Sequence, residues 1–154
     1  MNKTAILYIA LASFLLFGCA TKKDVMLAKA TPTHQVRTIA QAPQDGNSSD
    51  MNTNLQSALS KEGLTIKTLL PAGTRKSAEA DAIVSYSDVW RWDLVMYLKS
   101  VSIQLFDAQS GDLLISGNWS DSALHGFHDS KEVVQNLVSE MFDKLRNATP
   151  KETN

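Results

Sequence analysis

Two groups of side chains in this sequence have a specific chemistry: the single cysteine, Cys19, and the histidines, two of which lie close together at His125 and His128. A lone thiol in an exported protein is either free and reactive or has a special covalent use, because exported domains usually carry paired cysteines or none. Two nearby histidines can contribute to a metal site. The segments around these residues decide which chemistry is available.

Cys19 follows a short apolar segment at the start of the chain. Lys3 gives this start a positive charge, and residues 5–17 are almost all apolar, which is the pattern of a cleaved signal peptide. As a helix, the apolar segment would span about 20 Å, whereas the hydrocarbon core of a bilayer is about 30 Å thick. The segment therefore predicts export rather than a permanent transmembrane helix.

The residues Leu16-Phe17-Gly18-Cys19 resemble the lipobox of bacterial lipoproteins, with an aliphatic residue three positions before the cysteine and a small residue directly before it. Phe17 stands where that pattern usually has a small or β-branched residue. The resemblance implies signal cleavage between Gly18 and Cys19 and acylation of Cys19. The next residue, Ala20, is not Asp, and in enteric-type bacteria this implies sorting to the outer membrane with the domain facing the periplasm.

An acylated Cys19 would make the membrane a partner of the chain. Each buried CH₂ group of an acyl chain contributes about 0.8 kcal/mol, and two or more chains anchor a protein stably. Residues 1–18 are then the signal peptide, and the mature domain has no free thiol and no disulfide. Residues 19–33 lack a sustained alternation or helical stripe, and they predict a lipidated cysteine followed by a flexible tether.

His125 and His128, with Asp121 and Asp129 nearby, form the part of the sequence that is most like a metal site. A zinc site needs three or four ligands, and two histidines on a loop supply half of that set at best. The segment therefore predicts an exposed loop. A small envelope enzyme or metal-dependent factor that uses His125 and His128 is the alternative hypothesis.

No other pattern indicates catalysis. The sequence has no Gly-x-Ser-x-Gly motif, and its carboxylates fall mainly at predicted strand ends and turns, where Asp caps the backbone. Lys and Arg number 15 and Asp and Glu number 16, so the basic surface of a nucleic-acid-binding protein is missing. We predict no catalytic residues, no metal ligands, no cofactor and no nucleic-acid partner.

Aromatic residues are concentrated in one predicted strand, 82–92. Alternation places Tyr86, Trp90 and Trp92 on one face of this strand. Aromatic side chains are enriched at the energetic centres of interfaces, so these three residues are the candidate partner-binding surface. The same side chains would also supply the bulk that a covering helix needs in the core. The alternation alone is consistent with both interpretations.

The hydrophobic pattern predicts two helices and five strands. One helix begins near Ser49 or Asp50 and ends at Gly63, and the other is capped by Asp129 and continues to Arg146. Five segments have the alternation or the flanking turn residues of strands: 34–39, 64–70, 82–92, 97–106 and 112–119.

The order β-α-β-β-β-β-α predicts an α+β fold, a two-layer sandwich in which two helices cover a mostly antiparallel sheet of four to five strands. A single domain at 34–147 would be followed by a disordered tail at 148–154. The sequence resembles small periplasmic domains of bacterial lipoproteins of unknown function, in the Gly63-Leu64 step, the segments 81–87 and 106–112, and Trp90 and Trp92. This resemblance implies no activity.

Together these features predict a non-enzymatic binding or accessory module, anchored by lipid in the outer membrane, that holds an envelope protein nearby. The oligomeric state is left open by the sequence.

Overall fold

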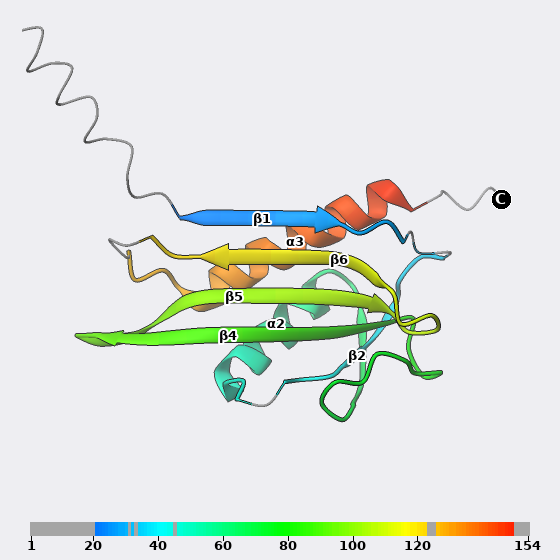
Figure 1. The fold of residues 1–154 in the computed structure, drawn as a ribbon, viewed down its shortest axis with the longest axis horizontal. Helices are drawn as coiled ribbons and strands as arrows, with labels where there is room; N and C mark the ends of the chain where they lie inside the picture. The colour runs from blue at the N-terminus through cyan, green and yellow to red at the C-terminus, as the bar shows by residue number, and fades with distance from the viewer. Residues whose placement is uncertain (1–20, 31, 33, 45, 123–125, 150–154) are drawn as a thin grey trace, which may run out of the picture.

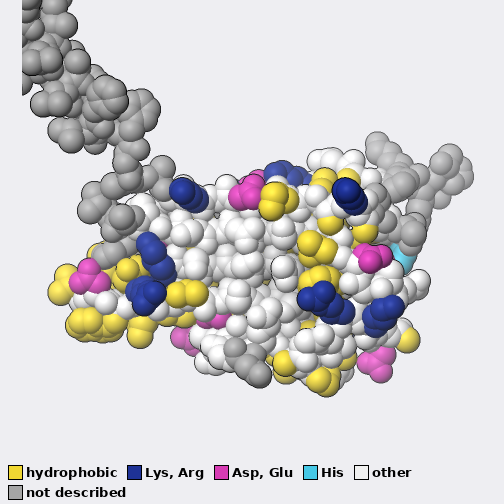
Figure 2. Space-filling model, viewed as in Figure 1, with side chains coloured by type: hydrophobic (Ala, Val, Ile, Leu, Met, Phe, Trp, Pro, Cys, Tyr) yellow, Lys and Arg dark blue, Asp and Glu magenta, His cyan; other side chains and the backbone are white. Residues whose placement is uncertain are grey.

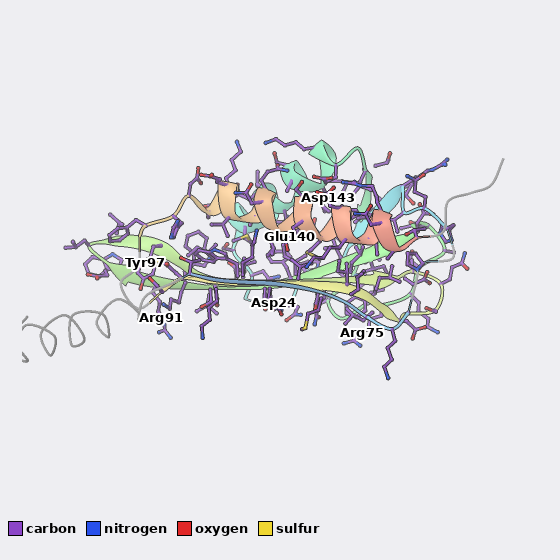
Figure 3. All side chains as sticks on the ribbon, turned by 90° about the horizontal axis from the view of Figure 1, so that it is seen from above. Asp24, Arg75, Arg91, Tyr97, Glu140 and Asp143 are labelled. Carbon is purple, nitrogen blue, oxygen red and sulfur yellow. The ribbon has the colours of Figure 1, made fainter. Side chains whose placement is uncertain are left out.

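The structure, a computed structural model, describes residues 21–30, 32, 34–44, 46–122 and 126–149. Within these residues the elements are β1 (Lys22–Leu27), β2 (Thr38–Gln41), α2 (Ser49–Lys61), β3 (Thr65–Leu69), β4 (Ala82–Asp93), β5 (Val95–Asp107), β6 (Leu113–Ser120) and α3 (Ser130–Ala148). Both helices lie on one side of a single sheet (Figure 1, Figure 3). The predicted α+β class with two helices is confirmed.

The sheet has the strand order β1-β6-β5-β4-β2-β3. Neighbours from β1 to β4 are antiparallel, whereas β2 is parallel to both β3 and β4. The predicted sheet of four to five mostly antiparallel strands is corrected to a mixed sheet of six strands in the described part of the chain. The parallel pair arises because α2 connects β2 to β3, and a helical crossover returns the chain in the same direction.

Strand β1 corrects the prediction of a flexible tether at 19–33. It pairs with β6 along its whole length. Val25 is buried, and its carbonyl accepts a hydrogen bond from the Lys144 ammonium at 2.9 Å. The Lys23 ammonium lies 2.7 Å from the Glu140 carboxylate of α3, and this hydrogen bond lowers the pKa of Glu140. Val25 is the one buried residue of β1, so no alternation marks the strand in the sequence.

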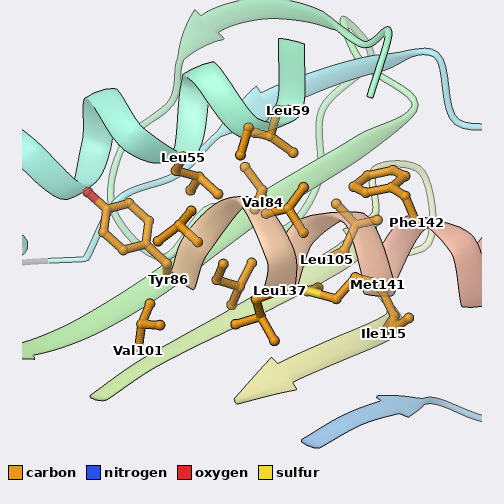
Figure 4. Packing of buried hydrophobic residues seen from close by; sticks show 14 of the residues in the cluster. Leu55, Leu59, Val84, Tyr86, Val101, Leu105, Ile115, Leu137, Met141 and Phe142 are labelled. Carbon is orange, nitrogen blue, oxygen red and sulfur yellow. The ribbon is translucent and has the colours of Figure 1, made fainter. Parts of the chain in front are cut away.

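The core lies between the helices and the sheet, and both helices bury the apolar stripes that their sequences predict (Figure 4). The buried residues of α2 are Met51, Leu55, Ala58 and Leu59, and those of α3 are Val134, Leu137, Val138, Met141, Phe142 and Leu145. Their periodicity of three and four residues is the strongest signal in the sequence, which explains why these elements are predicted correctly.

The helix ends differ slightly from prediction. Asp129 caps α3 as expected, by accepting a hydrogen bond from the backbone N–H of Lys131. The cap of α2 is Ser48, one residue before the earlier of the two predicted candidates. α3 continues to Ala148 and Thr149 is its C-cap, so the predicted tail at 148–154 begins too early. Residues 150–154 lie outside the described residues.

A bulge at Lys99 changes which residues of β5 face the helices. Strict alternation predicts that Tyr97 shares the face of Val101, but the pairing of β4 with β5 skips Lys99. Leu98 is therefore buried with Val101 instead. The bulge also lets the Lys99 ammonium donate to the backbone carbonyls of residues 121 and 122, each at 2.9 Å. The loop after β6 is thereby fixed to β5.

The sheet face away from the helices is mostly polar. At one end, the guanidinium of Arg75 lies over the ring of Phe106 at 4.7 Å from its centre. Elsewhere the face carries short polar side chains together with the exposed Val89. The Ser102 hydroxyl donates to the amide oxygen of Asn118 at 2.7 Å. Asp24 of β1 lies on the same side, opposite the helices (Figure 3). We call the part of this face that spans β1, β6, β5 and β4 the open face.

Candidate functional site

The chain enters the sheet directly after the expected lipid anchor. Cys19 lies outside the described residues, as does the predicted cleavage between Gly18 and Cys19, and acylation stays a prediction. Lys22 begins β1 three residues after Cys19. Three extended residues span about 10 Å at most. An acylated Cys19 would therefore hold this end of the sheet, called here the anchor end, close to the bilayer.

The β4–β5 hairpin projects from the anchor end. Lys22 is in register with Ser120 of β6, and Ser120 is in register with Ser100 of β5. Beyond this level, β4 and β5 remain paired up to Asp93 and Val95. Figure 1 shows the hairpin ending beyond the start of β1, at the same end of the molecule.

Residues 92–96 at the end of this hairpin are mostly apolar, and we call them the hairpin tip. Trp92, Leu94, Val95 and Met96 are exposed by 72%, 81%, 53% and 60%. Figure 2 shows hydrophobic side chains gathered at this end of the molecule. Contiguous exposed apolar groups of this kind mark sites of interaction with a protein, a ligand or a membrane.

The three aromatic candidates divide between core and surface. Tyr86 is buried, Trp90 is partly buried against the core, and Trp92 is exposed. Alternation places all three on one face, but the hairpin extends beyond the helices, so nothing in the described part of the chain covers its last residues. The Trp90 indole N–H and the Ser48 hydroxyl both donate to the Asp88 carboxylate, which ties β4 to the start of α2. Partner binding stays a prediction.

Burial and the negative charge of Asp88 raise the pKa of Tyr86 to about 12. An unfolded tyrosine has a pKa of about 10. The phenol therefore contributes stability that is fully present below pH 10 and is lost as the pH rises through about 12. We expect the urea midpoint of the wild type to fall more steeply across this window than that of Tyr86→Phe. Parallel midpoints in the two proteins would contradict the assignment.

The loop after β6 places His128 beside Asp121. The His128 Nε2 atom lies 3.6 Å from the Asp121 carboxylate, and the imidazole ring meets the Trp119 ring edge-on at 5.7 Å between centres. His125 lies outside the described residues. Among the residues that the structure describes, no three His, Cys, Asp or Glu side chains are grouped to hold a metal ion. The described residues of this loop therefore supply no complete ligand set for the alternative hypothesis of a metal or enzyme site.

Phe127 of the same loop supports the hairpin. Its ring meets the Tyr97 ring edge-on, with 5.8 Å between centres. Phe127 is itself partly exposed. It therefore extends the apolar surface from the hairpin tip toward the base of the hairpin. The sequence gives no signal for this contact, because it depends on the bulge at Lys99 that redirects Tyr97.

A hollow of about 540 Å³ lies elsewhere, between the C-terminal parts of α2 and α3 and the segment 35–37. Arg146 in its wall is bonded to Glu62 and Asp143, at 2.9 and 2.8 Å. This hollow contains none of the predicted site residues. In the part of the chain that the structure covers, neither helix is long and apolar enough to cross a membrane.

Comparison with known proteins shows a shared fold. No protein-family model and no curated protein matches the sequence. The PelC dodecamer from Paraburkholderia phytofirmans is similar, with a TM-score of 0.55 and 12% identity over 86% of this chain and 100% of that chain. A second PelC dodecamer structure, of a variant, gives a TM-score of 0.53 and 11% identity over the same shares.

A minor lipoprotein from Acinetobacter baumannii is a more distant match. It has a TM-score of 0.38 and 12% identity over 78% of this chain and 98% of that chain. The PelC likeness, at its level of identity, shows the fold alone.

Proposed function

We propose that the protein is a lipid-anchored, non-enzymatic module of the cell envelope that acts by binding another protein through the open face of its sheet. The observation that carries this proposal is the placement of that face. It begins at β1, directly after the expected anchor, and both helices lie on the opposite side of the sheet. A surface held in this way is presented to other envelope proteins at a constant distance from the membrane.

The open face offers both polar and apolar groups to a partner. A shallow groove of about 240 Å³ runs across it, with Lys22 and Asp24 at its β1 side. The rest of its lining combines short polar side chains with apolar ones: Ser87, Ser100, Ser102, Asn118 and Ser120, and Val89, Val101 and Trp119. Hydroxyl and amide groups can form hydrogen bonds with a partner and lose little conformational entropy, because short side chains have few rotamers. The two opposite charges on β1 add a preference for orientation.

A second copy of the chain is an alternative partner. Two solved structures that share this fold, both of PelC, are dodecamers. Most soluble oligomers are assembled from identical chains with closed symmetry. The second candidate function is therefore that of an accessory module that assembles with itself at the membrane.

In-cell cross-linking of the tagged full chain, followed by pull-down, tests the proposal. The variant Asn118→Arg places a long charged side chain on the open face, and Asn147→Arg makes the same change at an exposed position of α3. We expect one prominent cross-linked partner that is lost in Asn118→Arg and kept in Asn147→Arg, with both variants folded by circular dichroism. A multiple of the chain mass identifies self-assembly, and any other mass identifies a different partner.

Equal cross-linking in both variants, or no adduct in the wild type, would overturn binding through the open face.

A further inference from the structure

We propose that the hairpin tip is a second membrane contact, which enters the interfacial layer of the leaflet that holds the acyl chains of Cys19. The inference rests on the lipid anchor of the proposed function, but not on the protein-binding role of the open face. The occupant of the tip is therefore lipid, and a protein partner is an outcome of the test.

The hairpin tip has the side-chain chemistry of a lipid contact. Four of its five side chains are apolar, and each is more than half exposed. Leu94 has a φ of 61°, a left-handed conformation that a leucine rarely adopts and that a glycine or asparagine would adopt more readily. An apolar side chain at the apex of an exposed turn is suited to lipid rather than to water. Tryptophan is the side chain most typical of the membrane–water interface.

The hairpin tip also lies where it can reach the membrane. The tip and the start of β1 lie at the same end of the sheet (Figure 1). Val89 of β4 is in register with Ser100, at the level of Lys22, and the chain continues for five more residues to Leu94. At about 3.3 Å per residue, the tip extends about 16 Å beyond that level. The acylated residue can lie about 10 Å beyond it at most. The tip therefore reaches at least as far toward the bilayer as the anchor does.

The hairpin tip is supported and partly paired. The strands stay paired with each other up to Asp93 and Val95, which satisfies the backbone groups on their facing edges. The groups on the outer edges, which neither β2 nor β6 reaches at this level, need water or headgroups as partners, so the tip suits the interfacial layer and not the hydrocarbon core. The contact between Tyr97 and Phe127 and the Lys99 hydrogen bonds support the hairpin from the adjacent loop. A supported hairpin keeps its orientation and so loses little entropy when it contacts the membrane.

The charges near the tip set the depth of insertion. Arg91 lies directly behind the tip and Lys22 lies at the start of β1, where both can approach anionic headgroups. Asp93 lies within the tip, and Asp24 faces outward from β1. A carboxylate is costly in the hydrocarbon layer. The tip is therefore placed among headgroups and the first acyl carbons, and not deeper.

Tryptophan fluorescence of the full chain, isolated in its membrane-bound form, tests this placement. The protein is reconstituted into vesicles of phosphatidylethanolamine and phosphatidylglycerol, with or without lipids that are brominated near the headgroup. Bromine quenches a tryptophan that touches the lipid. The chain has three tryptophans, of which Trp119 is buried and Trp92 is exposed. We expect lipid quenching in the wild type, most of it lost in Trp92→Phe, and all of it kept in Trp119→Phe as the matched control.

Three results would overturn the proposal. Quenching of Trp92 by aqueous iodide but not by brominated lipid would place the tip in water. Protection from both quenchers would place it against protein. A chain that does not float with the vesicles would lack the anchor on which the inference rests. None of these three results depends on the cross-linking of Asn118→Arg. The two experiments therefore show separately whether the open face binds protein and whether the hairpin tip contacts lipid.

Discussion

Gly117→Val is expected to lower the free energy of unfolding by about 3 kcal/mol, at the upper end of the range for overpacked cores. Gly117 lies on the face of β6 toward α3. A Cβ atom at this position would lie 2.6 Å from the Met141 sulfur and 3.1 Å from a methyl carbon of Leu137. Valine adds two more carbon atoms to this contact. The buried side chains of Met141 and Leu137 must then leave their positions in a closed core, or α3 must shift away from the sheet. The shift in the urea midpoint at unchanged slope measures the effect.

The neighbouring residue Ser116 provides a matched control. It lies on the opposite face of β6, and Ser116→Val is expected to change stability by less than about 0.5 kcal/mol. Met141→Ala removes the methionine atoms with which the new valine side chain would clash. The double variant Gly117→Val/Met141→Ala should therefore be more stable than the sum of the two single effects predicts. The close approach of α3 to β6 would be contradicted if the two stability changes were strictly additive, or if Gly117→Val left the free energy of unfolding unchanged.

Cys19→Ser is expected to abolish acylation of the chain completely. The sequence contains no other cysteine, so no second thiol can form a thioether with a lipid. Metabolic labelling with a tritiated fatty acid, followed by immunoprecipitation, measures the loss. Intact-mass measurement of the wild type should also show removal of residues 1–18 and addition of acyl chains to Cys19. Label that persists in Cys19→Ser, or a wild type without label, would contradict the anchor.

Ala20→Asp is the control for this experiment. It leaves Cys19 in place, so we expect full labelling. By the sorting rule that the lipobox resemblance implies, the labelled chain should then remain in the inner membrane. Separation of the two membranes on a density gradient measures its position. A change in location without a change in labelling would separate sorting from acylation.

The helices and most strands could be predicted because their patterns are periodic and their interiors are apolar. The stripe of α3 from Val134 to Leu145 and the alternation in β4 from Val84 to Tyr86 are both of this kind. β1 could not be predicted, because Val25 is its one buried side chain and its stability comes from pairing with β6. The bulge at Lys99 shifts the alternation of β5 by one residue, and no local signal in the sequence marks it.

The candidate site could be predicted only in part, for a related reason. Alternation assigns Tyr86, Trp90 and Trp92 to one face, but it does not indicate where the helix layer ends. Tyr86 lies under α2 and Trp92 lies beyond it, so one residue is core and the other is surface. Leu94, Val95 and Met96 break the alternation, so the sequence pattern did not indicate them as candidate site residues. Their exposure follows from the length of the hairpin, which is a tertiary property.

The pairing of β1 with β6 also determines the order in which the domain can be completed. These strands lie near opposite ends of the chain, and contacts between distant segments form slowly because the chain between them must be ordered first. β1 is synthesised early and its partner strand late. Until β6 is in place, β1 has both edges unpaired. During that interval the exposed edge can pair with another chain. Pairing of β1 with β6 is then the step that joins the start of the chain to the sheet and removes this edge.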